Sequence, residues 1–258
     1  MMRTLLLLAC LLVGVFANAQ ELKIPKAHYP VLPKSGSTVD DFVPKGWVVE
    51  IQAKGDLNND GLGDFALLLH ENNPKNIVKN GDTSVELIDT NPRILVVIFG
   101  KKEGSYFLVL ENHALIPRYV NPLIVDFIDP DSISIERGIL RINLHIFPVQ
   151  DSIINNITYI FHWQNKRFEL IGHDSSTVYR SDGRLEKISI NYSTGKGLFY
   201  CGNIADEKEA WKAIPNFGTS TPDSTNPTYS VNTIETIGNG IESALGGYCS
   251  SEDFYLPR

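Results

Sequence analysis

The stretch ILRINLHIF, residues 139–147, decides the fold class of this chain. Apolar and polar residues alternate along it, as the neighbours Leu140 and Arg141 show. A period of two is typical of a β-strand that buries one face and exposes the other. The stretch therefore predicts a half-buried strand.

The same alternation recurs along the chain between turn signals. It is found at residues 133–135 before Arg137-Gly138, at 157–161, at 168–170 after Asn165-Lys166, and at 185–192. A further hairpin is predicted where residues 93–99 and 106–111 flank the turn GKKEG at 100–104. Short strands joined by turns without helices between them indicate an antiparallel meander. We expect an all-β fold in which this meander forms a sandwich, a barrel or a partial propeller-like array of sheets.

The sequence predicts at most one or two short helices. The stretch DEKEAWKAI, residues 206–214, has acidic residues early and an apolar face late, as a short helix does. Residues 234–245 fit either a strand pair or a helix, because Gly238 and Gly240 weaken both.

A second informative stretch is GDLNNDGLGD, residues 55–64, which reads as a calcium loop of the form D-x-N-x-D-G-x-x-D. Calcium takes several oxygen ligands at once, and alternate positions of a tight loop supply them. Gly61 permits the sharp turn because it has no Cβ. The predicted ligands of one structural calcium ion are Asp56, Asn58, Asp60, the backbone carbonyl of Leu62, and Asp64, which binds directly or through a water.

The residues of this loop allow two other interpretations. Asn, Asp and Gly also favour plain hairpin turns, which need no metal. A helix–loop–helix EF-hand requires a bidentate Glu at loop position twelve, where this chain has Leu67. The β-branched and aromatic residues 47–51 before the loop and the apolar run 65–69 after it favour a strand–loop–strand unit.

The stretch GDLNNDGLGDFALLL, residues 55–69, resembles the calcium loop of FG-GAP and VCBS-type repeats, the blade motif of integrin-like β-propellers. The chain also resembles a group of uncharacterised exported bacterial proteins that carry one such loop. The stretches FHWQ (161–164), RFELIG (167–172) and SINYSTGK (189–196) are similar to that group. The resemblance implies calcium binding and export, and it implies no particular activity. A full propeller needs several blades, and this sequence has one such loop.

The N-terminus has the pattern of a signal peptide over residues 1–19. Arg3 precedes an apolar run at 5–16, and Ala17-Asn18-Ala19 matches a cleavage site, so the mature chain is expected to start at Gln20. We therefore expect an exported protein, periplasmic or extracellular. A competing interpretation is a lipoprotein, with residues 7–10 as the lipobox and Cys10 lipidated. No other segment is apolar enough to cross a bilayer.

The net charge of the chain limits the classes of partner that it can bind. The formal net charge of -7 becomes -8 without Arg3, the one charged residue of 1–19, and this argues against nucleic acid or anionic lipid. The expected partner is an unidentified envelope protein or a glycan.

Cys201 and Cys249 remain after export and are expected to form a disulfide, with two separate buried thiols as the alternative.

These patterns divide the chain into four parts. A signal peptide at 1–19 is followed by an extended lead, rich in Pro, Lys and Ser, at 20–45. The antiparallel β domain is expected at 46–203 and contains the calcium loop. Residues 204–258 are expected to form a C-terminal extension that packs on the domain.

No catalytic motif is visible in the sequence. The histidines are scattered, and His145 and His162 fall at the polar positions of strands, where exposed residues are expected. Asp126, Asp129 and Asp131 surround Pro130 and most simply mark a turn, with a second cation site or catalytic carboxylates as the alternative. The expected function is a non-catalytic binding or structural module of the bacterial envelope.

The alternative function is a secreted hydrolase whose carboxylates are gathered by the fold, with Asp126 or Asp129 acting together with Glu136. Aromatic residues also concentrate in one part of the meander. Sugar-binding proteins stack ligands on exposed aromatics, but alternating positions in strands favour burial in the core. The aromatic residues concerned are Tyr159, Phe161, Trp163, Phe168 and Tyr192.

Overall fold

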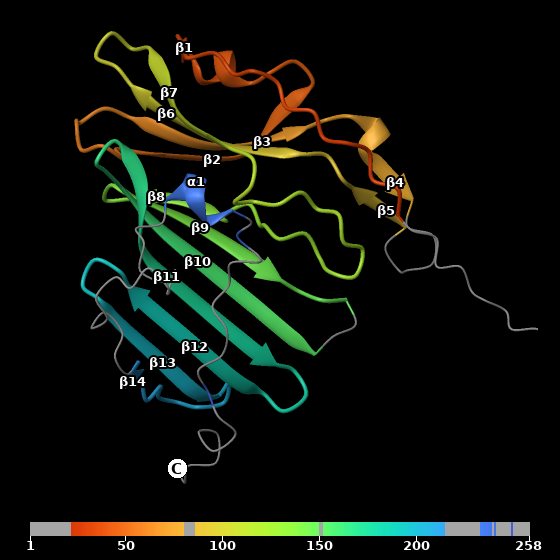
Figure 1. Cartoon of the computed structure of the whole chain (residues 1–258), viewed down its shortest axis with the longest axis vertical. Helices are drawn as coiled ribbons and strands as arrows, with labels where there is room; N and C mark the ends of the chain where they lie inside the picture. Colours follow the sequence, from red (N-terminus) through yellow and green to blue (C-terminus); the bar gives the residue numbers. More distant parts are fainter. Residues whose placement is uncertain are drawn as a thin grey trace, which may run out of the picture.

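The computed structural model describes residues 22–79, 86–149, 152–214, 233–238, 240 and 249. Within this part of the chain the fold is all-β, and every paired strand lies antiparallel to its neighbour (Figure 1). The predicted antiparallel fold is therefore confirmed. The helical elements are the 3₁₀ helices η1 (Val39–Phe42) and η2 (Pro74–Asn76) and the α-helix α1 (Ile234–Ile237).

A five-stranded sheet contains the predicted calcium loop. Its order is β1 (Ser35–Gly36), β7 (Tyr106–Asn112), β6 (Arg93–Gly100), β3 (Asp64–Glu71) and β2 (Trp47–Gly55). The strands β2 and β3 pair around the loop, with Gly55 opposite Asp64, so the strand–loop–strand prediction is confirmed. The predicted hairpin of residues 93–111 is formed by β6 and β7. Beside this sheet lies a two-stranded pair, β4 (Ile77–Lys79) and β5 (Leu87–Asp89).

A seven-stranded sheet follows, in which each strand pairs with its neighbours along the chain (Figure 1). The strands are β8 (Ile133–Glu136), β9 (Ile139–Ile146), β10 (Ile153–Gln164), β11 (Arg167–Tyr179), β12 (Arg184–Asn191), β13 (Lys196–Asn203) and β14 (Lys212–Ala213). This is the meander that the alternating residues 139–147 predicted.

The two sheets share one hydrophobic core. The five-stranded sheet contributes Leu68 and Val97 to it, and the seven-stranded sheet contributes Leu140 and Phe161, all of them fully buried. The strand β2 packs on β8, where a Cβ at Gly55 would lie 2.3 Å from Cγ2 of Ile135. A residue without a side chain is therefore needed at position 55 for the sheets to approach.

The other face of the five-stranded sheet is covered by the N-terminal lead. Leu67 and Ile98 point into a second cluster there, together with Leu32 and Phe42 of the lead. The lead is thus more ordered than the extended segment that its composition predicted, because residues 35–42 form β1 and η1. Burial of the apolar side chains of the lead stabilises this ordered conformation.

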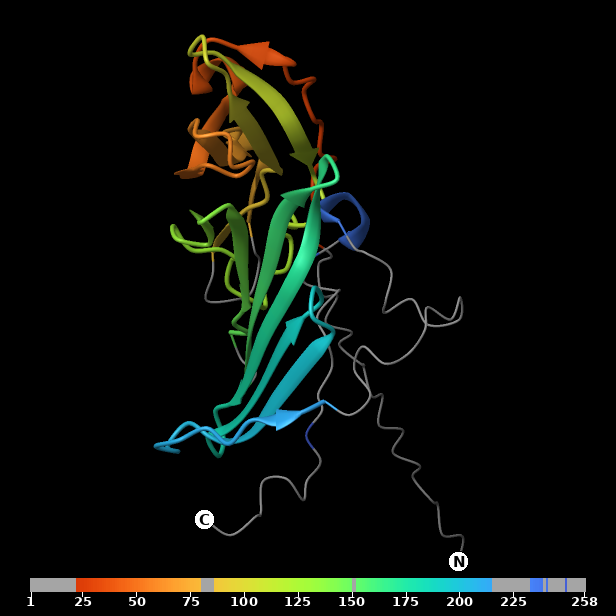
Figure 2. The same ribbon diagram turned by 90° about the vertical axis from the view of Figure 1, so that its left-hand side faces the viewer.

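The seven-stranded sheet extends beyond the five-stranded one, and C-terminal residues contact its inner face (Figure 2). Ile234 of α1 joins the shared core, and Thr233 bridges to Glu169 of β11. Farther along, the Tyr159 hydroxyl donates to the carbonyl oxygen of Gly240 at 2.6 Å. The described parts of the C-terminal extension therefore add to the cover that the five-stranded sheet gives to this inner face.

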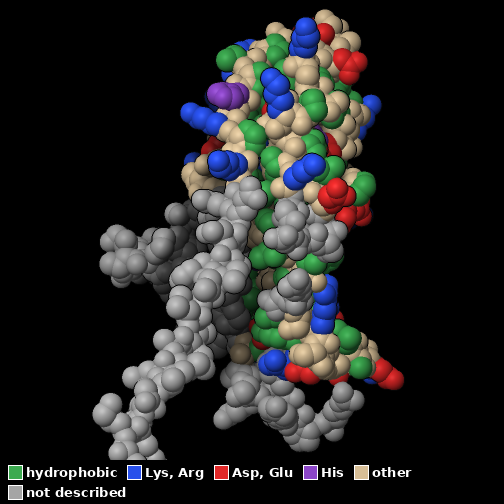
Figure 3. Space-filling model, turned by 90° about the vertical axis from the view of Figure 1, so that its right-hand side faces the viewer, with side chains coloured by type: hydrophobic (Ala, Val, Ile, Leu, Met, Phe, Trp, Pro, Cys, Tyr) green, Lys and Arg blue, Asp and Glu red, His purple; other side chains and the backbone are tan. Residues whose placement is uncertain are grey.

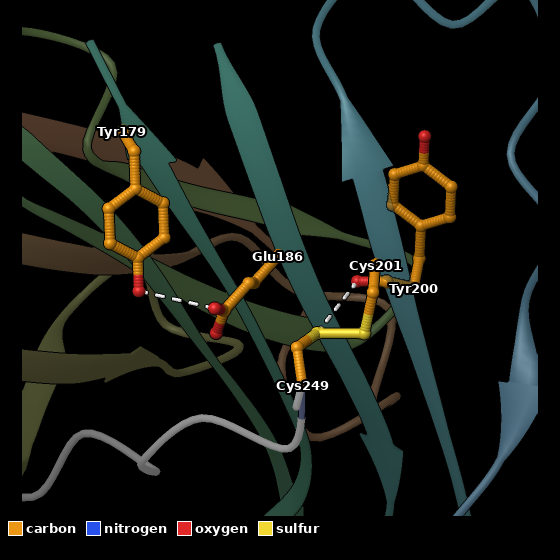
Figure 4. The surroundings of a disulfide bond; sticks show 5 residues. All are labelled: Tyr179, Glu186, Tyr200, Cys201 and Cys249. Carbon is orange, nitrogen blue, oxygen red and sulfur yellow. Dashed lines mark hydrogen bonds between the residues drawn. A yellow bond between two sulfur atoms is a disulfide. The ribbon is translucent and has the colours of Figure 1, made fainter. Parts of the chain in front are cut away.

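A disulfide between Cys201 and Cys249 fastens this extension to β13 (Figure 4). The two Cα atoms are 5.9 Å apart, and the residues are separated by 48 positions in the sequence. On the same face, the Tyr179 hydroxyl donates to Glu186 at 3.1 Å. The predicted disulfide is confirmed.

The prediction of a short helix at residues 206–214 was wrong. The segment forms a turn, a stretch without regular structure, and β14, whose residues pair with Leu198 and Phe199 of β13. The Tyr200 hydroxyl donates to Asp206 at 2.6 Å, and this bond fixes the turn. Tertiary contacts with β13 thus override the local helical pattern.

The predicted signal peptide at 1–19, the lipobox alternative at Cys10 and the mature terminus at Gln20 lie outside the described residues. Among the residues that the structure does describe, no helix has the length and apolar character needed to cross a bilayer.

Candidate metal centre and a polar trough

The loop between β2 and β3 folds around its own side chains. Asp56 accepts the Asp60 and Gly61 N–H groups, at 3.1 Å through Oδ1 and 2.9 Å through Oδ2. Asn58 Oδ1 also accepts from Asp60 N–H, at 3.0 Å, and Asp60 Oδ1 accepts from Leu62 N–H at 2.8 Å. These bonds hold the side chains of three predicted ligands in defined positions on the loop.

The loop backbone explains why the sequence needs these residue types. Asn59 has a φ of 60° and Gly61 a φ of 81°, both in the left-handed region. Glycine adopts this region freely, and asparagine tolerates it better than most residues do. The loop is therefore tightly turned for local reasons, as both the calcium interpretation and the plain-turn interpretation expect.

The third acidic group of the loop, Asp64, is fully buried at the start of β3. Its Oδ2 accepts from Leu57 N–H at 2.8 Å, and its Oδ1 accepts from Gly100 N–H at 3.0 Å. Burial raises the pKa of the Asp64 carboxyl, the two N–H bonds oppose that rise, and the charges of Asp60 and Asp56 add to it. A cation nearby would favour the charged carboxylate.

The loop lies where the two sheets meet. Leu57, between the first two predicted ligands, is fully buried in the shared core. At the loop tip, a Cβ at Gly138 in the β8–β9 turn would lie 3.2 Å from Oδ1 of Asn59. The conformation of the loop is therefore coupled to the contact between the sheets.

The donor set of the loop fits calcium by its chemistry, since every predicted ligand supplies oxygen. A carboxylate has about four lone-pair sites, so those of Asp56 and Asp60 keep acceptor capacity beyond their N–H bonds. Among the described residues, no three His, Cys, Asp or Glu side chains stand close enough to form a ready metal cluster. The five ligand assignments, Asp64 included, stay predictions.

The carboxylates that the hydrolase alternative requires have structural partners. Asp126 makes a two-point ion pair with Arg93, with nitrogen–oxygen distances of 2.8 Å and 2.6 Å. Arg93 also pairs with both carboxylate oxygens of Glu50, at 2.7 Å and 2.8 Å. Burial opposes the charge on Arg93, but its hydrogen bonds with both acids raise its pKa above the ordinary value. This pair joins β2 and β6 to the segment before β8.

The fold also separates Asp129 from Glu136, which the hydrolase alternative pairs as catalytic carboxylates. Glu136 pairs with Ile139 at one end of β9, whereas Asp129 contacts His145 near the other end, at 3.3 Å. Six residues of strand span about 20 Å. Paired glycosidase carboxylates lie roughly 5–10 Å apart. The strands therefore do not bring Asp129 and Glu136 close enough together to form a catalytic pair.

Two histidines, His145 and His173, are buried, and for His145 the prediction of an exposed residue was wrong. His145, predicted to be exposed, is 6% exposed and stacks on Phe147. His173 is 1% exposed, and its Nε2 has no hydrogen-bond partner in the described structure. Burial lowers the pKa of His173 to about 4, against a smaller opposite effect of Asp174.

The clustered aromatic residues form core. Tyr159, Phe161 and Phe168 are almost fully buried, and Trp163 and Tyr192 pack against the same cluster at its edge. The core interpretation of these residues is confirmed, so they offer no exposed platform for a sugar.

Two hollows, which the sequence did not predict, lie on the outer face of the seven-stranded sheet, the face that points away from the shared core. A hollow of about 500 Å³ crosses β10 to β13 and reaches Trp211. A second hollow of about 310 Å³ lies beside it over β9 and β10. The two share Asn156 and Thr158, and together we call them the polar trough after the polar side chains that line them, although the accessible surface of the larger hollow is mainly apolar. Sequence alternation placed polar residues on one strand face, but it could not show which of them become neighbours.

The described surface of another side of the molecule is drawn in Figure 3. Lys and Arg side chains are dotted singly over its upper and lower parts, and Asp and Glu side chains lie toward its edge. This view of the described residues contains no continuous basic stripe of the kind that nucleic acid favours.

Neither a protein-family model, nor a curated protein, nor a solved structure matches this chain. Its function must therefore be inferred from its own residues.

Proposed function

We propose that this protein is an exported, calcium-binding β-module of the bacterial envelope, which binds a partner and does not transform it. The observation that carries the calcium proposal is the oxygen-rich loop of residues 55–64 at the junction of the two sheets. Its resemblance to FG-GAP and VCBS-type loops supports the same proposal. Export is proposed from the signal-like pattern of residues 1–19.

The role of the calcium ion is structural. Asp56, Asp60 and Asp64 place three negative charges within one short loop, and mutual repulsion of such groups is costly without a cation. Because Leu57 anchors the same loop in the shared core, an ion that fixes the loop would also stabilise the contact between the sheets. The loop lacks a bidentate Glu, so its dissociation constant should be about 10⁻⁴ to 10⁻³ M, as in extracellular modules.

Calorimetric titration of the chelator-treated mature protein with calcium chloride tests this proposal. We expect binding of one ion, and a melting temperature that rises with calcium concentration because the ion binds the native state. Asp60→Ala should abolish both effects. Glu103→Ala removes an exposed acid from another loop and should change neither. Absence of binding to the wild-type protein at millimolar calcium would show that the loop is only a turn.

The binding role is proposed from two observations together. The carboxylates required by the hydrolase alternative are engaged in structural pairs or separated along β9. The outer face of the seven-stranded sheet instead carries an open, polar trough. A surface of this kind is suited to holding a ligand.

A further inference from the structure

The polar trough is built from two rows of residues that run across the seven-stranded sheet. Strand pairing places the residues of each row side by side. The first row is Asn143, Thr158, Asp174, Ser189 and Leu198, from β9 to β13. The second row is His145, Asn156, Ser176 and Lys187, from β9 to β12. Neighbouring groups of one row are therefore separated by the strand spacing of about 4.8 Å.

The shape of the trough follows from the sizes of these side chains. Its floor is made mainly of short Ser, Thr, Asn and Asp side chains, which leave space above the sheet. One end is bounded by Asp129, Asp131 and Ser132 before β8. The other end is bounded by Trp211, which comes just before β14. Figure 2 shows the seven-stranded sheet in profile, with the segment before β14 projecting at its lower end.

The tryptophan at this end is held in a defined orientation. Trp211 is 38% exposed, and its Nε1 donates to Glu209 at 3.0 Å. Glu209 is in turn ion-paired with Lys187 of the floor. The Trp211 ring also lies 6.1 Å from the ring of Tyr200. A rigid aromatic ring beside the 43%-exposed Leu198 offers an apolar surface next to a polar floor.

The floor keeps polar groups for a ligand. Thr158 donates to Asn143 at 2.8 Å, which fixes both side chains. Asp174 lies between Thr158 and Ser189 in the row, and no hydrogen bond or ion pair of its side chain is found among the described residues. Donors and acceptors thus alternate across several strands, beside apolar surface.

Charge selects among ligand classes. The trough contains Asp129, Asp131 and Asp174, whereas its ammonium group, that of Lys187, is already paired with Glu209. A phosphate-rich, sulfated or uronic-acid chain would meet these carboxylates, so nucleic acids and acidic glycans are disfavoured. A peptide strand finds no free sheet edge in the floor, because the backbones of β10 to β12 are paired on both sides and β14 pairs with Leu198 and Phe199 of β13.

We infer that the polar trough binds an oligosaccharide without acidic groups, with its sugar rings laid across the strands and one of them stacked on Trp211. Sugar hydroxyl groups both donate and accept hydrogen bonds, which matches the mixed floor, and the C–H face of a sugar ring matches an aromatic surface. The rows repeat on the scale of one sugar residue, so an extended chain contacts polar groups on each strand. This inference names the ligand of the proposed binding module and rests on that role, but it does not depend on calcium.

Titration of the mature, disulfide-bonded protein with cellohexaose, mannohexaose and chitohexaose tests the inference, with hexagalacturonate as the acidic probe. Calorimetry and tryptophan fluorescence are read together. We expect at least one neutral hexasaccharide to bind saturably and to change the fluorescence, and we expect no binding of hexagalacturonate. Failure of all three neutral probes, or equal binding of the acidic one, would overturn the inference.

Variants locate the site. Trp211→Ala should weaken binding by about tenfold or more, as expected for removal of an aromatic anchor. Asp174→Ala should weaken it as well, through loss of an acceptor in the floor. Phe107→Ala removes a ring that is also about one-third exposed, at 36%, but lies on the five-stranded sheet, so it should leave binding unchanged. Unchanged binding in Trp211→Ala would contradict the assignment.

The calcium and sugar proposals fail separately. Asp60→Ala alters the calcium titration, and Trp211→Ala alters the sugar titration. A protein that binds calcium but no sugar retains the proposed metal site and loses the trough assignment. The reverse result retains the trough and loses the metal site.

Discussion

The two large sheets bury their residues in different ways. In the five-stranded sheet every residue of β6 is buried, because one face meets the seven-stranded sheet and the other meets the N-terminal lead. In the seven-stranded sheet β9 and β10 bury alternate residues, and their outer face remains polar. Strands buried on both faces read as continuous apolar runs, and half-buried strands read as alternation.

The difference assigns separate roles to the sheets. The strand β6, covered on both sides, offers no open surface for a ligand, and its sheet carries the predicted calcium loop. A sheet with one uncovered face can present side chains at regular spacing. The comparison leads to four predictions, ordered by expected effect.

The largest difference between the two sheets is expected when a side chain on a covered face and one on the open face are each truncated. Leu67→Ala removes a fully buried side chain of β3 and should lower the free energy of unfolding by about 4 kcal/mol, through lost burial and a cavity. Ser189→Ala, on the outer face of β12, should change it by less than about 0.5 kcal/mol. Urea unfolding measures both. Equal losses would show that the outer face is covered in solution.

Loss of the disulfide tests how the inner face is completed. The double variant Cys201→Ser, Cys249→Ser releases a constraint spanning 48 residues, and the chain-entropy model gives a loss of about 4 kcal/mol. Hydrogen exchange should increase in β12 and β13 but not in β3 and β6. Reducing agent should have no further effect on the double variant. An unchanged unfolding midpoint in reduced wild-type protein would contradict this account.

The Arg93 ion pair tests what joins the five-stranded sheet to the segment before β8. Arg93→Ala should cost about 3 kcal/mol, because it leaves Glu50 and Asp126 facing one another without a cation. The value lies at the low end for a buried pair, since both carboxylates are partly hydrated. Lys101→Ala breaks an exposed pair with Glu103 and should cost less than about 0.5 kcal/mol in the same urea series.

The inner face of the seven-stranded sheet should show a pH dependence that originates at His173. Burial lowers its folded pKa to about 4, so the folded protein holds it neutral while the unfolded chain protonates near 6.5. Its contribution is constant above pH 6.5 and is lost as the pH falls from there to about 4. The total loss should approach about 3 kcal/mol.

Comparison of wild type with His173→Gln across pH 7.5 to 4 isolates this effect, since other groups titrate alike in both proteins. The stability of the wild type should fall more steeply than that of the variant below about pH 6.5. If the stability of the two proteins falls equally with pH, His173 is reached by water, and the inner face of the seven-stranded sheet is less completely buried than the five-stranded sheet.

The sequence by itself determined the strands and the disulfide. Alternation at residues 139–147 specified a strand, because strand periodicity is a property of neighbouring residues. The apolar run 65–69 fits a strand or a helix by its pattern, and only the loop before it favoured a strand. The calcium loop was placed on a hairpin for the same reason, since Gly61 and the turn residues act locally. The expectation of export favours pairing of Cys201 and Cys249 by chemistry alone, because exported chains usually oxidise their cysteines.

Only the tertiary structure decided which distant residues meet. Local pattern favoured a helix at 206–214, but residues 212–213 pair with β13 as a short strand, and Trp211 lies at the end of the trough. His145 fell in a polar position, yet Asp129 and Phe147 bury it. The row of Thr158, Asp174 and Ser189 depends on the register of three strands. Register is set by pairing between segments far apart in sequence, which no single stretch encodes.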